Sequence, residues 1–430
     1  MALLKSINEL PEDILRIMLF EFVNREVEGS WEGEHQLPES LRCVCRWWKE
    51  LVDGSPELWH HINVRLGHLQ VEPFVNRLRK AKRLPLTLNI YSPLARDEGA
   101  FTQVVLELYD LVKEHPWRVL SIFSPAYLTS FGIFFRHVLD NPQTCRLSSF
   151  LIERCISFHG GRPIRTLARK ALQQNLTITH LAIPEEFLEP THPLLRVVSY
   201  LRLMRGWAQP SILKVIGEAS SVTTLTADFV LATRESGDSI PLRLLPRLKQ
   251  LDIRDSPEFP ELLLLGLDLP SIQSLKLKEI GSSVDHGNRQ LRNLRASVSW
   301  LARIKSLTLD MVRISDKMLL QTLQQLSLLE YLEVISVDDV SGKTTRALSQ
   351  QPTVDRGWLC PLLEEIRFGY PSGVRPRLLE SDVAALVRAR VRDVAPVGVI
   401  TSNQPSPSRL RKVTYGYRDM VRGISRCDGI

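Results

Sequence analysis

The chain has 430 residues, of which 44% are hydrophobic and 24% charged, and its formal net charge is +7. This composition is that of a soluble globular protein with a sizeable core, and the length allows about three ordinary domains or one long repeat array. No apolar run approaches the roughly 18–20 residues of a membrane span, and charged residues interrupt the first twenty positions. We therefore expect neither a membrane segment nor a secretory signal, and a cytoplasmic or nuclear location.

Charge is unevenly distributed along the chain. Residues 1–66 contain 7 Lys/Arg and 12 Asp/Glu, whereas the remainder contains 48 and 36. An acidic head on a basic body suggests two kinds of partner, with solubilising surface charge as the alternative for the body. The six cysteines include no C-x-x-C pair. We therefore expect reduced thiols, no zinc site and no cofactor.

The first predicted element is a short, very apolar helix within residues 7–23. Pro11 suits its first turn, and Glu12 and Asp13 complement the helix dipole. Apolar residues at 10, 14, 18 and 22 form one broad stripe. An isolated helix of this length is marginally stable in water, so it needs a partner inside or outside the chain.

Two further helices are predicted: one over 38–52 and, within residues 55–62, a short one that Ser55 caps and that ends on Leu58 and Trp59. Trp47, Trp48 and Trp59 give this module more large apolar surface than about 60 residues can bury. Surplus aromatic surface on a small module is typical of an interface.

These residues resemble the F-box family. The resemblance covers residues 7–62 and implies docking on a Skp-type adaptor within an SCF (Skp–cullin–F-box) ubiquitin ligase. The implied adaptor contacts are Leu10, Pro11, Ile14, Leu15, Met18, Leu19, Leu41, Val44, Cys45, Trp48, Leu51, Leu58 and Trp59.

One segment departs from the family pattern, which usually joins the first two helices by a short turn. Here an acidic insertion spans residues 24–40, and we expect it to be a solvent loop. The alternative for the whole module is that its helices only cap the core of the next domain.

Strands and helices are predicted to alternate from residue 84 onward. Residues 84–90 and 117–123 are expected to be strands, and the pattern L-x-x-L-x-x-L-x-L then recurs with strands near 150, 181, 225, 251, 275, 307, 332 and 366. A last strand is predicted at 410–415. Helices are predicted between them, over 101–115, 211–219, 316–326 and 381–391.

The intervals between these strands are 24–44 residues, and leucine-rich repeats span about 20–29. We predict an α/β chain in which the three-helix F-box module, residues 1–66, precedes a curved, irregular leucine-rich-repeat solenoid with a parallel sheet, residues 67–430. A doubly wound α/β domain is the alternative, although no Gly-rich phosphate loop follows any strand. The whole layout also resembles F-box proteins common in basidiomycete fungi.

The sequence also predicts a second surface, on the concave face of the sheet. In a leucine-rich strand the apolar residues point inward, so their neighbours line that face. The predicted substrate-binding residues are Gln250, Asp252, Arg254, Lys276, Lys278, Asp310, Tyr331, Glu333 and Arg367. Both charge signs occur and aromatic residues are few, which favours a protein or peptide over nucleic acid.

No catalytic or metal-binding motif was found, so we expect a non-catalytic substrate receptor that binds the adaptor, and through it a cullin ligase, and a protein substrate. Two alternatives stay open: a protein-interaction scaffold outside ubiquitin transfer, and a nucleic-acid-binding repeat protein. The basic tail, residues 409–426 with Tyr415 and Tyr417, is the candidate nucleic-acid segment, although an ordinary last strand explains it as well.

Overall fold

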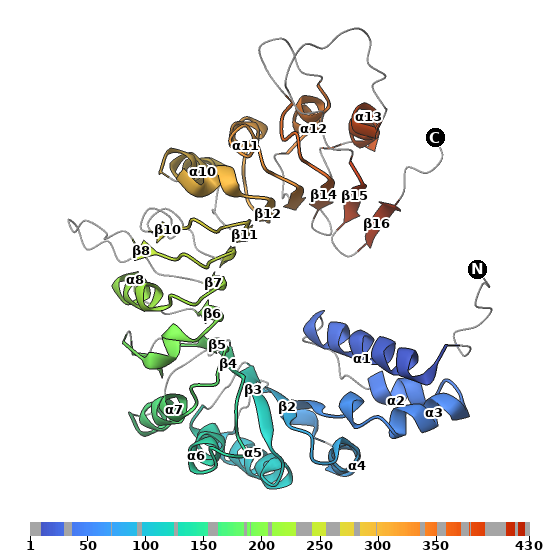
Figure 1. The fold of residues 1–430 in the computed structure, drawn as a ribbon, viewed down its shortest axis with the longest axis vertical. Helices are drawn as coiled ribbons and strands as arrows, with labels where there is room; N and C mark the ends of the chain where they lie inside the picture. Colours follow the sequence, from blue (N-terminus) through green and yellow to red (C-terminus); the bar gives the residue numbers. More distant parts are fainter. Residues whose placement is uncertain are drawn as a thin grey trace. The chain divides into compact units, whose positions relative to one another are not determined.

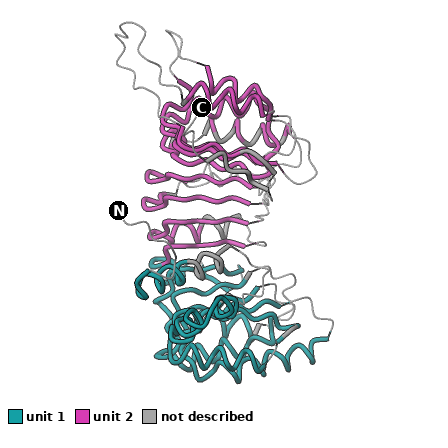
Figure 2. The backbone as a smooth tube through the Cα atoms, turned by 90° about the vertical axis from the view of Figure 1, so that its right-hand side faces the viewer, with its two compact units in different colours: residues 1–197 teal, residues 198–430 magenta. Residues whose placement is uncertain are grey.

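The computed structural model describes most of the chain. The described residues are 10–29, 37–69, 71–92, 97–123, 128–153, 162–184, 187–189, 191–204, 209–228, 243–254, 267–278, 284–297, 299–335, 340–350, 358–370, 378, 380–391, 410–417 and 420–425. The chain divides into two compact units, residues 1–197 and 198–430 (Figure 2). In each unit helices alternate with strands, so the fold class is α/β, as predicted. No helix of the described ranges is both long and apolar enough to cross a bilayer.

The first unit begins with a cluster of helices, called the helical cluster below. It consists of α1 (Glu12–Gly29), α2 (Leu37–Arg42), α3 (Arg46–Asp53) and the 3-10 turn η2 (Pro56–Leu58). The prediction of a solvent loop over residues 24–40 is wrong at both ends, because 24–29 belong to α1 and 37–40 to α2; residues 30–36 lie outside the described residues. The sequence "NREVEG" holds strong helix formers and no proline, and Pro38 fits a first helical turn.

The single helix predicted over residues 38–52 is instead two helices separated by a turn at residues 43–45. The backbone of Cys45 is extended, with φ −162° and ψ 173°, and Cys45 is the N-cap residue of α3. The turn rotates Val44 out of the apolar face that a continuous helix would have, while Leu41 and Trp48 stay buried. Ser55 was expected to cap the next helix, but its hydroxyl donates to the Leu51 carbonyl oxygen at 2.7 Å instead.

Five parallel strands form the sheet of the first unit. In spatial and chain order they are β1 (His61–Arg65), β2 (Leu86–Tyr91), β3 (Trp117–Phe123), β4 (Ser149–Glu153) and β5 (His180–Ile183). The connecting helices, which lie along one side of these strands in Figure 1, are α4 (Val71–Ala81), α5 (Glu98–Val112), α6 (Gly132–Asp140) and α7 (Arg162–Gln174). Short 3-10 turns occur at η3 (Leu66–His68), η4 (Leu128–Phe131) and η6 (Pro193–Arg196).

This sheet already begins within residues 1–66, the segment predicted to be the helical domain. β1 pairs in register with β2, from His61 opposite Thr87 to Arg65 opposite Tyr91. The predicted domain boundary after residue 66 therefore differs from the division of the chain into units, because both strands lie in the first unit.

The second unit repeats strand and helix in the same way. Its main strands are β6 (Tyr200–Leu203), β7 (Thr224–Asp228), β9 (Gln250–Arg254), β11 (Ser274–Lys278), β12 (Ser306–Asp310), β13 (Tyr331–Ile335), β14 (Glu365–Tyr370), β15 (Lys412–Tyr417) and β16 (Met420–Ser425). Neighbouring strands in this order are parallel, except that β16 is antiparallel to β15. A separate two-residue parallel pair joins β8 (Arg243–Leu244) to β10 (Leu267–Asp268).

The described helices of the second unit lie along one side of its strands (Figure 1). They are α8 (Gln209–Glu218), α10 (Val284–Ser297), α11 (Asp316–Leu323), α12 (Gly342–Ser349) and α13 (Glu380–Val391), with the 3-10 turn η7 (Ser299–Arg303). A doubly wound sheet carries helices on both faces, so the arrangement described for this unit is not that of the doubly wound alternative.

Side chains alternate between the two faces of the second unit's strands. Leu251 and Leu275 represent the first face, whose apolar residues are almost completely buried and form the core. The opposite face carries the polar and charged neighbours of these leucines. One face therefore packs in the core, and the polar face is the surface that this sheet offers to a partner.

The predicted strands near 88, 120, 150, 181, 225, 251, 275, 307, 332, 366 and 412 are all confirmed. β6 was missed, although Leu195, Val198, Leu201 and Leu203 follow the repeat spacing with one leucine replaced by valine. It divides the longest predicted interval, from 181 to 225, into 20 and 24 residues, both close to the usual repeat length.

Candidate protein-interaction surfaces

The helical cluster has a core of its own. Seven of the thirteen predicted adaptor contacts are buried in it: Leu15, Leu19, Leu41, Trp48, Leu51, Leu58 and Trp59. Leu10 is half-buried. In this conformation the seven buried side chains have no surface to offer a partner, so their contribution to binding is to hold the helices in place.

Trp59 is the centre of this core, with no exposed surface. Its indole Nε1–H donates to the Val52 carbonyl oxygen at 2.8 Å, and the Lys80 ammonium lies 4.0 Å from the centre of its ring. Because Lys80 comes from α4, the helix between β1 and β2, this cation–π contact joins the cluster to the sheet-bearing part of the first unit.

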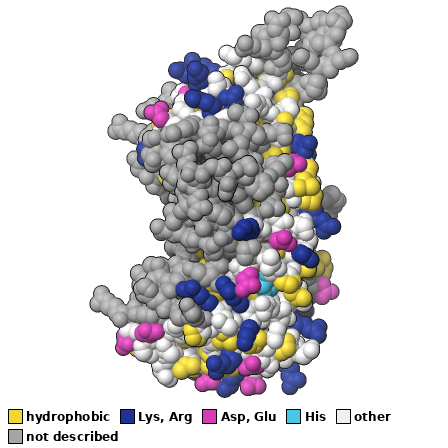
Figure 3. Space-filling view, turned by 90° about the vertical axis from the view of Figure 1, so that its left-hand side faces the viewer, with side chains coloured by type: hydrophobic (Ala, Val, Ile, Leu, Met, Phe, Trp, Pro, Cys, Tyr) yellow, Lys and Arg dark blue, Asp and Glu magenta, His cyan; other side chains and the backbone are white. Residues whose placement is uncertain are grey.

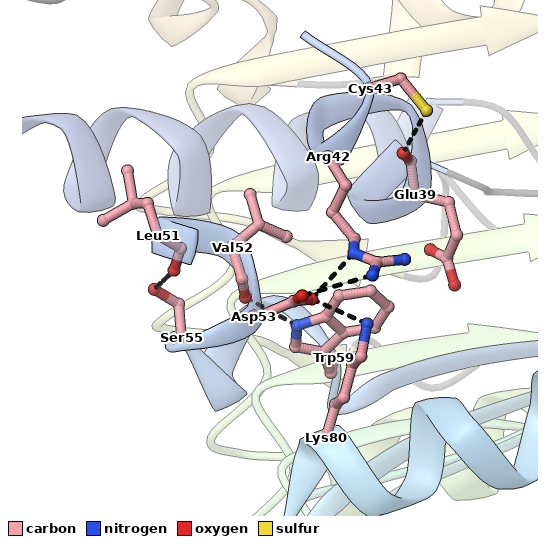
Figure 4. A network of polar contacts seen from close by, with 9 residues as sticks. All are labelled: Glu39, Arg42, Cys43, Leu51, Val52, Asp53, Ser55, Trp59 and Lys80. Carbon is pink, nitrogen blue, oxygen red and sulfur yellow. Dashed lines mark hydrogen bonds and ion pairs between the residues drawn. The ribbon is translucent and has the colours of Figure 1, made fainter. Parts of the chain in front are cut away.

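The Asp53 carboxylate completes this junction (Figure 4). Lys80 Nζ lies 2.7 Å and Arg42 Nε 2.8 Å from its Oδ1 atom, so one carboxylate at the end of α3 contacts cations from α2 and α4. Burial opposes ionisation of Asp53, but the hydrogen bonds and charges of Lys80 and Arg42 outweigh it and lower the pKa of Asp53 below its usual value. The carboxylate is thus ionised at neutral pH, as its two ion pairs require.

A second apolar stripe of α1 faces away from this core. Ile14, Ile17 and Met18 follow the i, i+3, i+4 spacing of one helix face, and they are 46%, 59% and 46% exposed. Leu15 and Leu19, which directly follow Ile14 and Met18 and so lie on a neighbouring face of the helix, are buried. An amphipathic surface helix normally has one apolar stripe. The second stripe of α1 is therefore a surface that a partner would cover.

The turn between α2 and α3 exposes another apolar side chain. Val44 is 60% exposed, and Cys43 and Cys45 on either side of it are exposed free thiols. Pro11, before α1, is also exposed. Five predicted adaptor contacts are thus accessible: Pro11, Ile14, Met18, Val44 and Cys45. Ile17 was not among the predicted contacts, although its position three residues after Ile14 was the available signal.

The polar face of the second unit's sheet, called the polar face below, is the other candidate surface. Strand register aligns its residues in rows across the strands. One row runs Arg202, Thr226, Asp252, Lys276, Thr308, Glu333, Arg367 and Thr414. All nine predicted substrate-binding residues lie on this face, in this row or in the two beside it.

Three carboxylates of the polar face, those of Asp228, Asp252 and Glu333, lie beside cations. Asp228 lies 2.6 Å from Arg202 and 3.8 Å from Arg254, and Asp252 lies 2.6 Å from Arg254. On the far strands Glu333 lies 3.2 Å from Arg367. Carboxylates that are almost buried, as Asp228 and Asp252 are, require such partners.

Further pairs follow along the same face. Glu365 lies 2.7 Å from Lys412, and the Thr308 hydroxyl donates to Glu333 at 3.4 Å. Burial, followed by the charges of Glu333 and Glu365, raises the pKa of Tyr331 to about 12, so its phenol stays neutral and can donate a hydrogen bond.

The predicted list for this face lacked Arg202, Asp228 and Lys412, which form ion pairs there. Arg202 belongs to the overlooked strand β6. Asp228 and Lys412 lie on β7 and β15, which were predicted, and alternation along those strands was the available signal.

Comparison with known proteins adds no relative: no family model matches the chain, and no curated protein matches it significantly. The function is therefore inferred from these two surfaces, the helical cluster and the polar face.

Proposed function

We propose that the chain is the substrate-recognition subunit of an SCF-type E3 ubiquitin ligase. In this proposal the helical cluster is an F-box that binds a Skp-type adaptor, and the repeat body is an irregular leucine-rich-repeat solenoid that holds a protein substrate. The chain has no catalytic residue of its own and acts in the cytoplasm or nucleus. Ubiquitin transfer is promoted by proximity within the assembled ligase.

One observation carries the proposal: the second, exposed apolar stripe of α1 coincides with positions of the F-box pattern. Ile14 and Met18 belong both to that pattern and to the exposed stripe, and Val44 in the α2–α3 turn does so too. Exposed apolar side chains gathered on one face of a soluble protein are typical of a protein-interaction site.

The junction of Asp53, Trp59 and Lys80 supports the first half of the proposal. A docking module has to be held firmly by the chain that it anchors, which a loosely tethered helical cluster would not be. The buried contact between the helical cluster and α4 fixes the cluster to the first unit's sheet.

A reconstituted ligase tests this function without knowledge of the substrate. The purified chain is mixed with a Skp-type adaptor, a cullin ligase, ubiquitin and its activating and conjugating enzymes, and ubiquitin attached to the chain itself is measured. We expect the chain to be ubiquitinated, and Val44→Glu to abolish this by preventing assembly. Leu328→Glu places the same charge at an exposed leucine of the second unit and should have no effect.

Two results would contradict the proposal. A chain that binds the adaptor but acquires no ubiquitin would act as a scaffold outside ubiquitin transfer. Equal ubiquitination of the wild type and the Val44→Glu variant would show that modification does not depend on the helical cluster.

A further inference from the structure

On the polar face, basic side chains extend further into solvent than the acidic side chains that they pair with. In each of the five ion pairs given above for this face, the basic side chain is more exposed than the acidic one. Asp252 is 5% exposed and Arg254 31%, Glu333 is 13% and Arg367 35%, and Glu365 is 30% and Lys412 54%. An approaching molecule therefore contacts ammonium and guanidinium groups first, and the carboxylates lie deeper.

Lys276 contributes a cation in the middle of this surface. It is half-buried and stands in register between Asp252 on β9 and Thr308 on β12. The Asp252 carboxylate is engaged by Arg254, and Lys276 makes no hydrogen bond or ion pair with the residues that the structure describes. Lys278, also half-buried, stands in the adjoining row of the same strand.

From this arrangement we propose that the polar face binds an acidic, extended segment of a partner protein. The acidic segment is the substrate class of the proposed receptor, and in that respect the inference rests on the proposed function. Carboxylates of the segment would pair with Lys276 of β11 and with the cations of β9, β14 and β15, whose own acidic partners lie deeper in the face.

The dimensions of the sheet define the length of that segment. β9 and β15 are five strand spacings apart, or about 24 Å at about 4.8 Å for each spacing. An extended chain rises about 3.3 Å per residue, so about eight residues would cross the cationic side chains of this face. Side chains of one face recur every second residue, so alternate acidic residues fit best.

One other feature favours a peptide over nucleic acid. The described positions of the polar face include two aromatic side chains, Tyr200 and Tyr331, whereas single-stranded nucleic acid binding relies on stacking of successive bases on aromatic side chains. On the helix side of the molecule, seen in Figure 3, basic, acidic and apolar side chains of the described residues are interspersed.

Fluorescence anisotropy with the full-length chain tests the inference. The probe is a labelled 12-residue peptide of alternating Glu and Ser, compared with a Lys/Ser peptide and a 12-nucleotide oligothymidylate. We expect the acidic peptide to bind most tightly and Lys276→Glu to weaken it at least about tenfold, the loss of a charge-assisted hydrogen bond. Lys317→Glu makes the same charge change at an exposed position of α11 and should alter affinity less than about twofold.

Three outcomes would overturn the inference: failure of the acidic peptide to bind, equal weakening by both substitutions, or tighter Lys276-dependent binding of oligothymidylate. Circular dichroism confirms that the variants are folded, and Lys276→Gln, expected to weaken binding several-fold, replaces Lys276→Glu if that variant is not. Adaptor binding is measured on the same samples and should be unchanged by Lys276→Glu. Loss of adaptor binding with intact peptide binding would contradict the proposed function alone.

Discussion

At the scale of single residues, the helical cluster separates side chains that build it from side chains that face outward. Trp59 is completely buried, whereas Ile17 is 59% exposed. Trp59→Ala should lower the free energy of unfolding by about 3–5 kcal/mol, because it leaves a large cavity and removes the contact with Lys80. Ile17→Ala should change it by less than about 0.5 kcal/mol. Urea unfolding of the two variants beside the wild type measures both effects.

The same variants also show whether Trp59 affects adaptor binding directly or only through the fold. If Trp59→Ala weakens adaptor binding only in proportion to the loss of folded cluster, Trp59 acts through the fold. A Trp59→Ala variant as stable as the wild type would contradict the buried role assigned here.

A second residue, His61 on β1, makes stability depend on pH. Burial, then the charges of His60, Arg77 and Arg118, lower the pKa of His61 to about 3, against an ordinary value of 6.5. Between these values the unfolded chain binds the extra proton, so stability is complete above about pH 6.5 and falls as the pH drops towards 3. The slope is at most about 1.4 kcal/mol per pH unit for this residue.

His61→Thr should remove this part of the pH dependence. Thr suits the strand and lies opposite Thr87. From pH 7 to 5.5 the wild type should lose about 1 kcal/mol more unfolding free energy than the variant. Parallel losses in the two proteins, measured by urea unfolding at both pH values, would show that His61 is not protonated on unfolding.

At the scale of elements, α10 and α11 approach each other at Gly287. A Cβ atom at this position would overlap the Arg313 carbonyl oxygen, and the adjacent Asn288 side chain accepts hydrogen bonds from Ser315, the N-cap of α11. Gly287→Ala should therefore destabilise the protein by about 1–3 kcal/mol, although alanine is the better helix former.

Gly99→Ala in α5 is the matched control for this prediction. Its Cβ would meet only Asp97 Oδ1 at 3.4 Å, an ordinary contact. We expect no loss of stability, or a gain below about 1 kcal/mol. Equal thermal midpoints for the Gly287→Ala variant and the wild type would contradict the close approach of α10 to the chain before α11.

Element types were predictable from the sequence where hydrophobic spacing is regular, as in β9, β11, β12 and β13. The α2–α3 break was not, because Val44 and Cys45 fit the apolar face of a continuous helix equally well.

The candidate surfaces were predictable to a similar degree. Alternation along strands was sufficient to place Asp252 and Lys276 on the polar face. By contrast, the sequence could not separate buried Leu15 from exposed Ile14 and Ile17, since helix α1 is apolar on two sides. The junction of Asp53 with Lys80 joins residues 27 positions apart and had no local signal.

At the scale of the whole molecule, we assign two functions to two surfaces of one chain. The helical cluster is proposed to bind the ligase adaptor, and the polar face of the second unit to bind an acidic substrate segment. Each surface can be altered without touching the other, which makes the two assignments separately testable.

Isothermal titration of a Skp-type adaptor into the full-length chain tests whether α1 is a docking helix. We expect a one-to-one complex that is weakened about a hundredfold or more when Ile14, Ile17 and Met18 are all replaced by Asp, with circular dichroism unchanged. Leu106→Asp, at an exposed leucine of α5, should bind like the wild type. Absence of a complex with the wild-type chain, or equal affinity for the triple variant, would contradict the claim that α1 is a docking helix.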